Sequence, residues 1–494
     1  MLEERDSYTY EVYNAFTMKE QKLKQIFIWI VAISGFILVF LTPPLAVPDE
    51  NTHFINAYCT SRLNLFPDVN PENGAIGKYL PKYIAVFTEK YCEKYSGRLK
   101  EGYSFTENYF DSWLPVSQED REAVFWQNDL VTINPWSYVV SGIGMRITSI
   151  ICTVTGGGFD NAYNLLIAGR MFNLIFYVLI GYWAISISPC LKKVMMLLLS
   201  MPISLFLGAS LSYDALLIPV SMLLFAELMR LFIDFEQNKV NRRDMFIVFF
   251  CTLFLTAIKT AYAPFLILLI LVPIKKYKSF KQYGISIGVV GIAGCIGLII
   301  PKILTMFAMK NSVQTTNPNI IIQKEYLLQH ICEFPSIICN TFIKYSNFYL
   351  SSFVAKLGQL DTNFPIIYIG VLVVILTIVT LYECCNVGKI DWKIKSGAVV
   401  TTLIVIIGIF VAMYITWTPR VEKPCGQTVS GVQGRYFIPV FCFASVLIFN
   451  NIGNKIPDKI NSVICHIAEH ITIFFVILNC LLTVLFLLLR YWCN

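Results

Sequence analysis

The feature that most constrains this chain is a succession of apolar runs, each long enough to cross a lipid bilayer. About 20 apolar residues in a helix span the hydrocarbon core, where backbone groups must pair within their own segment. Only 14% of the 494 residues are charged and 56% are hydrophobic, whereas a soluble protein carries about 25% charged residues. The sequence therefore predicts an all-α polytopic membrane protein.

Basic residues gather in the short loops between apolar runs, and they set the expected orientation, because loops rich in lysine and arginine stay on the cytoplasmic side. Residues 1–24 are polar and end in Lys19, Lys22 and Lys24, so we expect a cytoplasmic tail. Counting crossings from loop to loop predicts about eleven transmembrane helices, with the C-terminus outside.

Residues 25–490 are expected to form a single membrane domain with outer segments at 45–134, 302–365 and 418–436. The first of these is the largest, and its short amphipathic pieces indicate interfacial helices. Residues 136–153 are apolar enough to cross, but the number of crossings between the flanking basic loops favours an interfacial or re-entrant helix on the outer face. Whether this helix crosses the membrane stays open at this point.

Two apolar stretches are expected to reverse direction. The run 245–274 has basic loops on both sides, so it must turn, and the sequence KTAYAP at 259–264 marks the turn. A lysine at that depth is costly unless it is paired or solvated. The runs on either side of Asp214 form a second out-and-back pair, with Asp214 at the outer end.

The stretch LTPPLAVPDENTH, residues 41–53, follows the first apolar run. Its prolines block further helix, so the chain leaves the membrane there in a defined direction. Asp49 is placed as the N-cap of a new helix, and His53 lies four residues on, on the same face. The stretch is either a site at the mouth of the membrane domain or a helix stop followed by an ordinary N-cap.

The polar residues close to apolar runs gather at one face of the expected topology. They are Asp49, Glu50, His53, Arg170, Asp214, Lys259, Tyr262, Asp361, Gln433 and Arg435. An arginine binds phosphate through two parallel hydrogen bonds, and a lysine adds a point charge. A carboxylate opposite them could act as a general base toward a hydroxyl group. The pattern predicts a site for an anionic substrate at the outer membrane boundary.

Several of these residues also have a structural explanation. Asp214 could cap its helix, with Ser212 as the alternative cap. Arg170 and Lys259 could extend to lipid headgroups. The sequence GVQGRYFIP around Arg435 could be a tight glycine turn followed by an aromatic anchor.

The sequence argues against two kinds of partner. The 15 cysteines are scattered without a CxxC motif or a Cys/His metal spacing, so a zinc site is not expected. The net charge of +7 does not indicate nucleic acid, because most clustered basic residues lie in loops between apolar runs. A divalent cation stays open: Asp49, Glu50 and Asp214 could hold one, although no spacing rule supports it.

Seven motifs occur in an order that resembles a known family. They are VPDENTH, NPWSY, AGRMFN, SLSYDAL, KTAYAP, LGQLDTNFP and GVQGRYFIP. Together they resemble the bacterial multispanning proteins of domain-of-unknown-function family 2142, over roughly residues 25–450. The GWLD sequence usual in that family stands here as Gly358-Gln359-Leu360-Asp361, so any role of its tryptophan is absent.

The family is similar in layout to the GT-C glycosyltransferases, which place an acidic residue at the start of a large first outer loop. The resemblance implies transfer of a sugar from a polyprenyl-phosphate donor to a cell-surface glycan or glycolipid acceptor, on the outer face of the bacterial cell membrane. Asp49 matches the acidic residue by position, with Glu50 as the alternative base. Membrane lipid, donor, acceptor and possible polysaccharide-assembly proteins are the implied partners.

Under this reading Arg170, Lys259 and Arg435 hold the lipid phosphate, while His53, Tyr262 and Gln433 orient the sugar or the acceptor. Two non-enzymatic alternatives remain: a transporter or flippase for a lipid-linked oligosaccharide, and a scaffold for surface-polysaccharide assembly. A transporter often shows internal repeats and charges near the membrane midplane. No repeat is visible here, and the polar residues gather at one face, which favours the enzyme.

Overall fold

The computed structural model describes residues 2–96, 116–155, 160–233, 239–312, 317–388 and 390–493. Within these residues, eight helical segments are long and apolar enough to cross a membrane. They confirm an all-α polytopic membrane protein, while the total of about eleven crossings stays a prediction. Five of these segments lie within one helix each: Glu20–Leu41 in α1 (Leu2–Leu41), α6 (Ala162–Ile187), α9 (Asp214–Ile233), α15 (Ile366–Cys385), and Ile460–Tyr491 in α19 (Asp458–Tyr491). The other three extend over more than one helical element. They are Pro135–Val154 with α5 (Val139–Val154), Phe280–Ala308 with α11 (Phe280–Gly294) and α12 (Ile300–Ala308), and Trp392–Val421 with α16 (Trp392–Thr416) and α17 (Thr418–Val421).

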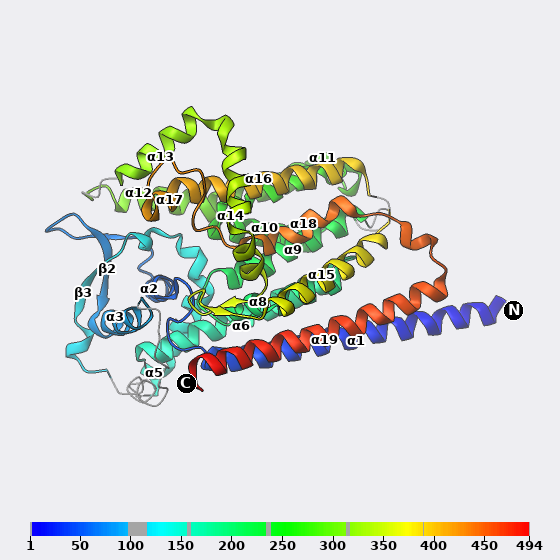
Figure 1. Ribbon diagram of the computed structural model, residues 1–494, viewed down its shortest axis with the longest axis horizontal. Helices are drawn as coiled ribbons and strands as arrows, with labels where there is room; N and C mark the ends of the chain where they lie inside the picture. Colours follow the sequence, from blue (N-terminus) through cyan, green and yellow to red (C-terminus); the bar gives the residue numbers. More distant parts are fainter. Residues whose placement is uncertain are drawn as a thin grey trace.

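Helix α9 forms the centre of the bundle, because it is the most completely buried of these helices. It packs against α6, α10 (Arg242–Ile258) and α18 (Ile438–Ser445). Helices α1 and α19 run side by side along one edge, with the two chain ends at opposite ends of this helix pair (Figure 1). The hydrophobic core therefore surrounds α9, and lipid-facing helices surround the core.

The expected reversal within 245–274 is present. Helix α10 ends at Ile258, Lys259 is extended, and the chain returns as the 3₁₀ helix η4 (Thr260–Leu271). The backbone N–H of Val240 donates to the carbonyl of Lys276 at 2.9 Å, so the two ends of the hairpin meet. Lys259 consequently lies at the tip, about 25 Å from the start of α10, since a helix rises 1.5 Å per residue.

The segment before α9 is also broken, into two short helices. It consists of α7 (Lys192–Ser200) and α8 (Pro202–Gly208), which are separated at Met201. A proline has no N–H and fits the first turn of a helix, so Pro202 starts a new helix rather than continuing α7. The chain then turns through Ser212 into α9, which places Asp214 at the first position of the central helix.

The first outer segment contains a small sheet that the sequence did not predict. After α2 (Glu50–Ser61), strands β1 (Asp68–Val69), β2 (Ile76–Pro81) and β3 (Ala123–Gln127) form an antiparallel sheet. Helix α3 (Lys82–Ser96) follows β2, and the whole unit sits at one end of the bundle (Figure 1). The strands are short and two of them pair across a long separation in sequence, so local periodicity carries little sign of them.

The second outer segment is mostly helical. The continuous helical segment Phe280–Ala308 leads into it, and α13 (Pro318–Gln329) and α14 (Phe334–Val354) follow. A short hairpin of β4 (Lys356–Leu357) and β5 (Thr362–Asn363) then leads into α15.

Both ends of α5 are tied to the same side of the molecule. Before α5, Tyr138 makes a 2.9 Å hydrogen bond with His53 of the first outer segment. After α5, Asp160 pairs with Arg121 of that same segment at 2.9 Å. The residues on both sides of α5 therefore contact the first outer segment, while the placement of 136–153 along the outer face stays a prediction, since this segment is also apolar enough to cross.

Candidate functional site

The chain between α1 and α2 is held in an unusual conformation that presents Asp49. Residues 41–48 are buried, whereas Asp49 is exposed and has a left-handed backbone with φ 61°. A left-handed conformation costs a residue other than glycine about 1–2 kcal/mol, and aspartate is among those that adopt it most readily. Asp49 is the N-cap of α2, as predicted, but its side chain makes no capping hydrogen bond. The explanation as an ordinary N-cap is therefore wrong, because the carboxylate is left available.

The neighbouring Glu50 is buried in an ion pair with Arg170. Glu50 accepts from Nε and Nη2 of Arg170 at 2.9 and 2.6 Å and from the backbone N–H of Leu211 at 3.1 Å. The remaining N–H groups of Arg170 donate to the carbonyls of Val39, Thr42 and Pro43. Both side chains are 0% exposed. Arg170 therefore joins α6 to the end of α1 and has no N–H left for a substrate.

Two residues that the sequence did not single out fix the same stretch from other directions. Gln359 donates to the carbonyls of Leu45 and Val47 at 3.0 and 2.9 Å. Trp492 donates to the carbonyl of Leu41 at 2.8 Å. Gln359 lies in the LGQLDTNFP motif, which was a usable signal, whereas nothing in the sequence around Trp492 indicates this contact.

His53, four residues after Asp49, is buried beside the side chains of Tyr138 and Tyr213. Its Nδ1 lies 2.9 Å from the Tyr138 hydroxyl, and its ring meets that of Tyr213 edge-on at 5.0 Å. Burial lowers the pKa of His53 below its ordinary value, although the charges of Asp49 and Asp214 act in the opposite direction. The imidazole is thus neutral at neutral pH and can accept or donate one hydrogen bond through each nitrogen.

Asp214 and Arg435 form a buried ion pair. Their closest atoms, Oδ2 and Nε, lie 3.5 Å apart, and both side chains are nearly inaccessible. The pair makes no hydrogen bond, and within the part of the chain that the structure describes Nε and Nη1 of Arg435 are buried without a hydrogen-bond partner. Ser212 accepts from the backbone N–H of Asp214 at 3.2 Å, and this leaves the Asp214 carboxylate for the ion pair.

Lys259 completes the positive side of the site. Its Nζ is buried, has no hydrogen-bond partner among the described residues, and lies 3.4 Å from the ring centroid of Tyr436. The Tyr262 hydroxyl donates to the backbone carbonyl of Tyr436 at 2.8 Å, which joins the KTAYAP turn to the GVQGRYFIP motif. Buried donors without partners are rare and costly in proteins, so these groups need an explanation.

The charged groups that act on one another show which of these residues lie close together. The charges of Asp49 and Asp214 both act on His53, Tyr138 and Arg435. Together with Lys259 these residues form what we call the outer cluster: Asp49, His53, Tyr138, Asp214, Lys259 and Arg435. Residues from the five motifs VPDENTH, NPWSY, SLSYDAL, KTAYAP and GVQGRYFIP therefore meet in one place.

The family assignment follows from a comparison with known families. The family model described as "Predicted membrane protein (DUF2142)" matches residues 32–444. The chain belongs to this family. No curated protein and no solved structure matches the chain. All the motifs that form the outer cluster lie within the matched part of this DUF2142 protein, whereas Trp492 lies beyond it.

Two of the predicted site residues lie at the edge of the site in this DUF2142 protein. Asp361 pairs with Arg490 at 3.0 Å and so joins the LGQLDTNFP loop to the end of α19. Gln433 has a buried Oε1 without a hydrogen-bond partner, directly before the turn that carries Arg435. Gly431, two residues before Gln433, has φ 86°, which agrees with a glycine turn at the start of GVQGRYFIP.

The possible ligands for a divalent cation do not assemble. Among the described residues no three His, Cys, Asp or Glu side chains are grouped as a metal would require. Glu50 is occupied by Arg170, and Asp214 faces Arg435. Asp49, Glu50 and Asp214 therefore do not fit a shared cation.

Tyr138, Tyr213 and Tyr436 are the site residues that sequence reasoning missed. All three lie inside the motifs quoted for the family resemblance, NPWSY, SLSYDAL and GVQGRYFIP. The signal was present, but tyrosines are common in this chain, with 26 in total, and an aromatic residue near a membrane surface is usually an anchor. Only the packing around His53 and Lys259 separates these tyrosines from the others.

Proposed function

We propose that the protein is a membrane glycosyltransferase that moves a sugar from a polyprenyl-phosphate donor to a glycan or glycolipid acceptor on the outer face of the bacterial cell membrane. One observation carries this proposal: Arg435 and Lys259 are buried cations with N–H groups that lack hydrogen-bond partners, beside the available carboxylate of Asp49. Such donors suit the oxygens of a phosphate, which would satisfy them.

In the proposed reaction the Asp49 carboxylate takes the proton from the acceptor hydroxyl. The hydroxyl oxygen then forms a bond to the anomeric carbon of the donor, while the bond between that carbon and the phosphate oxygen breaks. The polyprenyl phosphate leaves with the electron pair, and Arg435 and Lys259 stabilise its charge. His53 and Gln433 orient the sugar or the acceptor, and Asp214 holds Arg435 in place.

The full set of contacts made by Glu50 and Arg170 supports a positioning role for both, rather than the roles of alternative base and phosphate ligand. Glu50 already accepts three hydrogen bonds from Arg170 and Leu211, and its side chain is 0% exposed, so an acceptor hydroxyl has no access to it. Tyr262 and Asp361 likewise position loops, through Tyr436 and Arg490.

Two measurements separate binding from transfer. In detergent, a polyprenyl phosphate should raise the Tm of the wild type and of Asp49→Asn, but much less that of Arg435→Gln or Lys259→Gln. In cells that carry only the variant, mass spectrometry of the surface glycans should show loss of the modification with Asp49→Asn. Arg420→Gln, at an exposed arginine of an outer segment, is the matched control and should behave as the wild type in both measurements.

Retention of the glycan modification in Asp49→Asn cells would contradict the assignment of Asp49 as the general base. Movement of a lipid-linked oligosaccharide across reconstituted vesicles, unchanged in Asp49→Asn, would instead support the flippase.

A further inference from the structure

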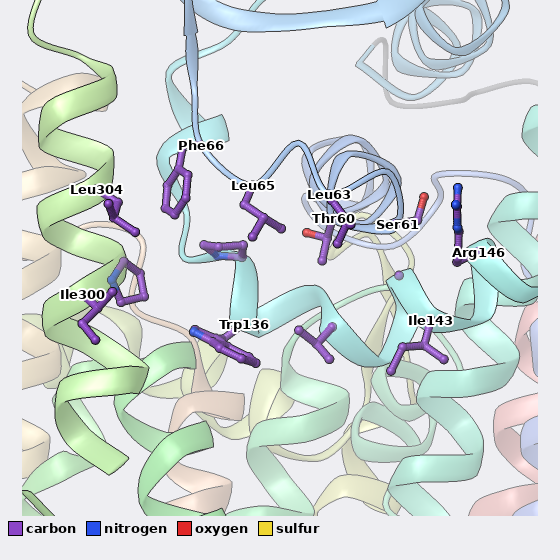
Figure 2. A pocket seen from close by; sticks show the side chains of 14 residues that line it. Thr60, Ser61, Leu63, Leu65, Phe66, Trp136, Ile143, Arg146, Ile300 and Leu304 are labelled. Carbon is purple, nitrogen blue, oxygen red and sulfur yellow. The ribbon is translucent and has the colours of Figure 1, made fainter. Parts of the chain in front are cut away.

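A second feature lies on the other side of the turn that carries Tyr138. It is an apolar groove with a volume of about 420 Å³ between α5, the end of α2 and α12. In Figure 2, Leu65, Trp136 and Ile143 line the same space, while Ile300 and Leu304 lie at one end and Arg146 at the other. Pockets of this volume accept small-molecule ligands.

The chemistry of the lining restricts the kind of ligand that the groove can bind. Nearly all of it is hydrocarbon, from side chains such as Leu63, Phe66 and Leu304. The groove lies between two segments that are apolar enough for a membrane, Pro135–Val154 and Phe280–Ala308, and the second is only 17% buried within the protein. A molecule that enters from this flank therefore comes from the bilayer.

The exposed face of α5 agrees with this placement. Ile143, Ile147, Ile150, Ile151 and Val154 are each at least 40% exposed. Their spacing of three to four residues puts them along one stripe of the helix. A helix with such a stripe lies in the interface with its apolar side in the acyl chains.

Arg146 supplies the charge at the end of the groove. Its side chain is exposed, and it has no ion-pair partner within the described ranges. Arg62 reaches the same part of α5, where its Nη2 donates to Ser149 at 2.8 Å. The guanidinium group of Arg146 at the end of an apolar groove complements a lipid with a hydrocarbon chain and a phosphate, and Arg62 adds positive charge about one turn further along α5.

We propose that this groove seats a hydrocarbon chain of an anionic phospholipid of the surrounding bilayer, with its phosphate at Arg146. The site is distinct from the outer cluster and does not depend on the proposed glycosyl transfer. Trp136 and Tyr138 belong to one 3₁₀ turn, η3 (Pro135–Tyr138), so a lipid against Trp136 braces the turn that positions Tyr138 on His53.

The test uses the full chain in detergent with dioleoyl phosphatidylglycerol or dioleoyl phosphatidylcholine. Phosphatidylglycerol should raise the Tm of the wild type by several degrees more than phosphatidylcholine does. Arg146→Gln should remove this difference, Ile143→Trp should reduce the response to both lipids by filling the groove, and Arg420→Gln should respond as the wild type. An equal phosphatidylglycerol response in Arg146→Gln would overturn the proposal, and so would a full response to inorganic phosphate without lipid.

A second readout remains informative if a variant folds poorly. In vesicles that contain phosphatidylglycerol with brominated acyl chains, the fluorescence assigned to Trp136 by subtracting a Trp136→Phe variant should be quenched. Absence of that quenching in vesicles that incorporate the protein would contradict a lipid chain in the groove.

Discussion

Arg170 and Glu50 lie 120 residues apart in the sequence and make a two-pronged ion pair with no exposure to solvent, at 2.9 and 2.6 Å. The pair is the point at which the end of α1, the start of α2 and α6 are joined. Because Glu50 directly follows Asp49, the same contacts that bury one carboxylate present the other.

Breaking this pair should unfold the region around it. Arg170→Met leaves the buried Glu50 carboxylate without its ion-pair partner and removes a donor from three carbonyls, and loss of one member of a buried pair costs about 3–5 kcal/mol. We expect a large fall in the Tm in detergent and low expression. The matched control is Arg121→Met, which removes a similar two-pronged pair with Asp160 at a half-exposed position and should cost about 0–1 kcal/mol. Equal effects of the two variants would contradict the positioning role of Arg170.

The left-handed backbone of Asp49 predicts an order of stability among its variants. Asp49→Gly should be at least as stable as the wild type, because glycine adopts positive φ without strain. Asp49→Asn should be close to the wild type, and Asp49→Ala should be less stable, since alanine is strained at this φ. Thermal unfolding in detergent measures the order. A more stable Asp49→Ala would show that the backbone conformation is different.

Acidification should destabilise the protein partly through His53. Burial keeps the pKa of His53 below its ordinary value of 6.5 in the folded state. Above that value both the folded and the unfolded chain are neutral at this position, so His53 has no effect on stability. Below it the unfolded chain takes up a proton that the folded chain does not, so the free energy of unfolding falls as the pH falls from 6.5 toward the lower folded pKa.

The Tm of the wild type should therefore fall between pH 7.5 and pH 5.5 by more than that of His53→Gln. Glutamine cannot titrate and keeps a polar group near Tyr138. His330→Gln, at an exposed histidine that contacts Glu333, is the control. If His53→Gln loses as much stability as the wild type, another group is responsible.

The contact of Lys259 with the Tyr436 ring predicts a specific sensitivity at Tyr436. A buried cation over an aromatic ring is worth about 2 kcal/mol, so Tyr436→Leu should lower the Tm while Tyr436→Phe retains most of it. Tyr345→Leu removes an exposed contact with Lys344 and should have little effect. The interpretation fails if Phe and Leu at position 436 are equivalent.

The orientation of the protein can be tested with epitope insertions. An epitope in the exposed turn at residues 71–73 of the first outer segment should bind antibody on intact cells, once any outer envelope layer is made permeable to antibody. An epitope at Lys278, in the basic loop after the η4 hairpin, should bind only after the cell membrane is opened. The opposite pattern would place the outer cluster on the cytoplasmic side.

The sequence by itself determined the class of fold and the main breaks in the helices. Apolar length predicts spanning helices, and basic loops predicted the reversal at Lys259, because both depend on the free energy of placing short segments in lipid. The motifs that form the outer cluster were also visible, since prolines, glycines and charges beside apolar runs stand out locally. The small sheet in the first outer segment was not visible, because its β2–β3 pairing joins segments that are far apart in sequence.

Tertiary structure alone separated Asp49 from Glu50. In sequence they are adjacent acids and either could be the base, but Arg170 and the N–H of Leu211 bind one of them, whereas a left-handed turn exposes the other. It also separated Arg170, with every N–H satisfied, from Arg435, with buried N–H groups still without partners. Both distinctions depend on which distant groups complete the hydrogen bonds of a buried charge, and those partners are set by packing rather than by local sequence.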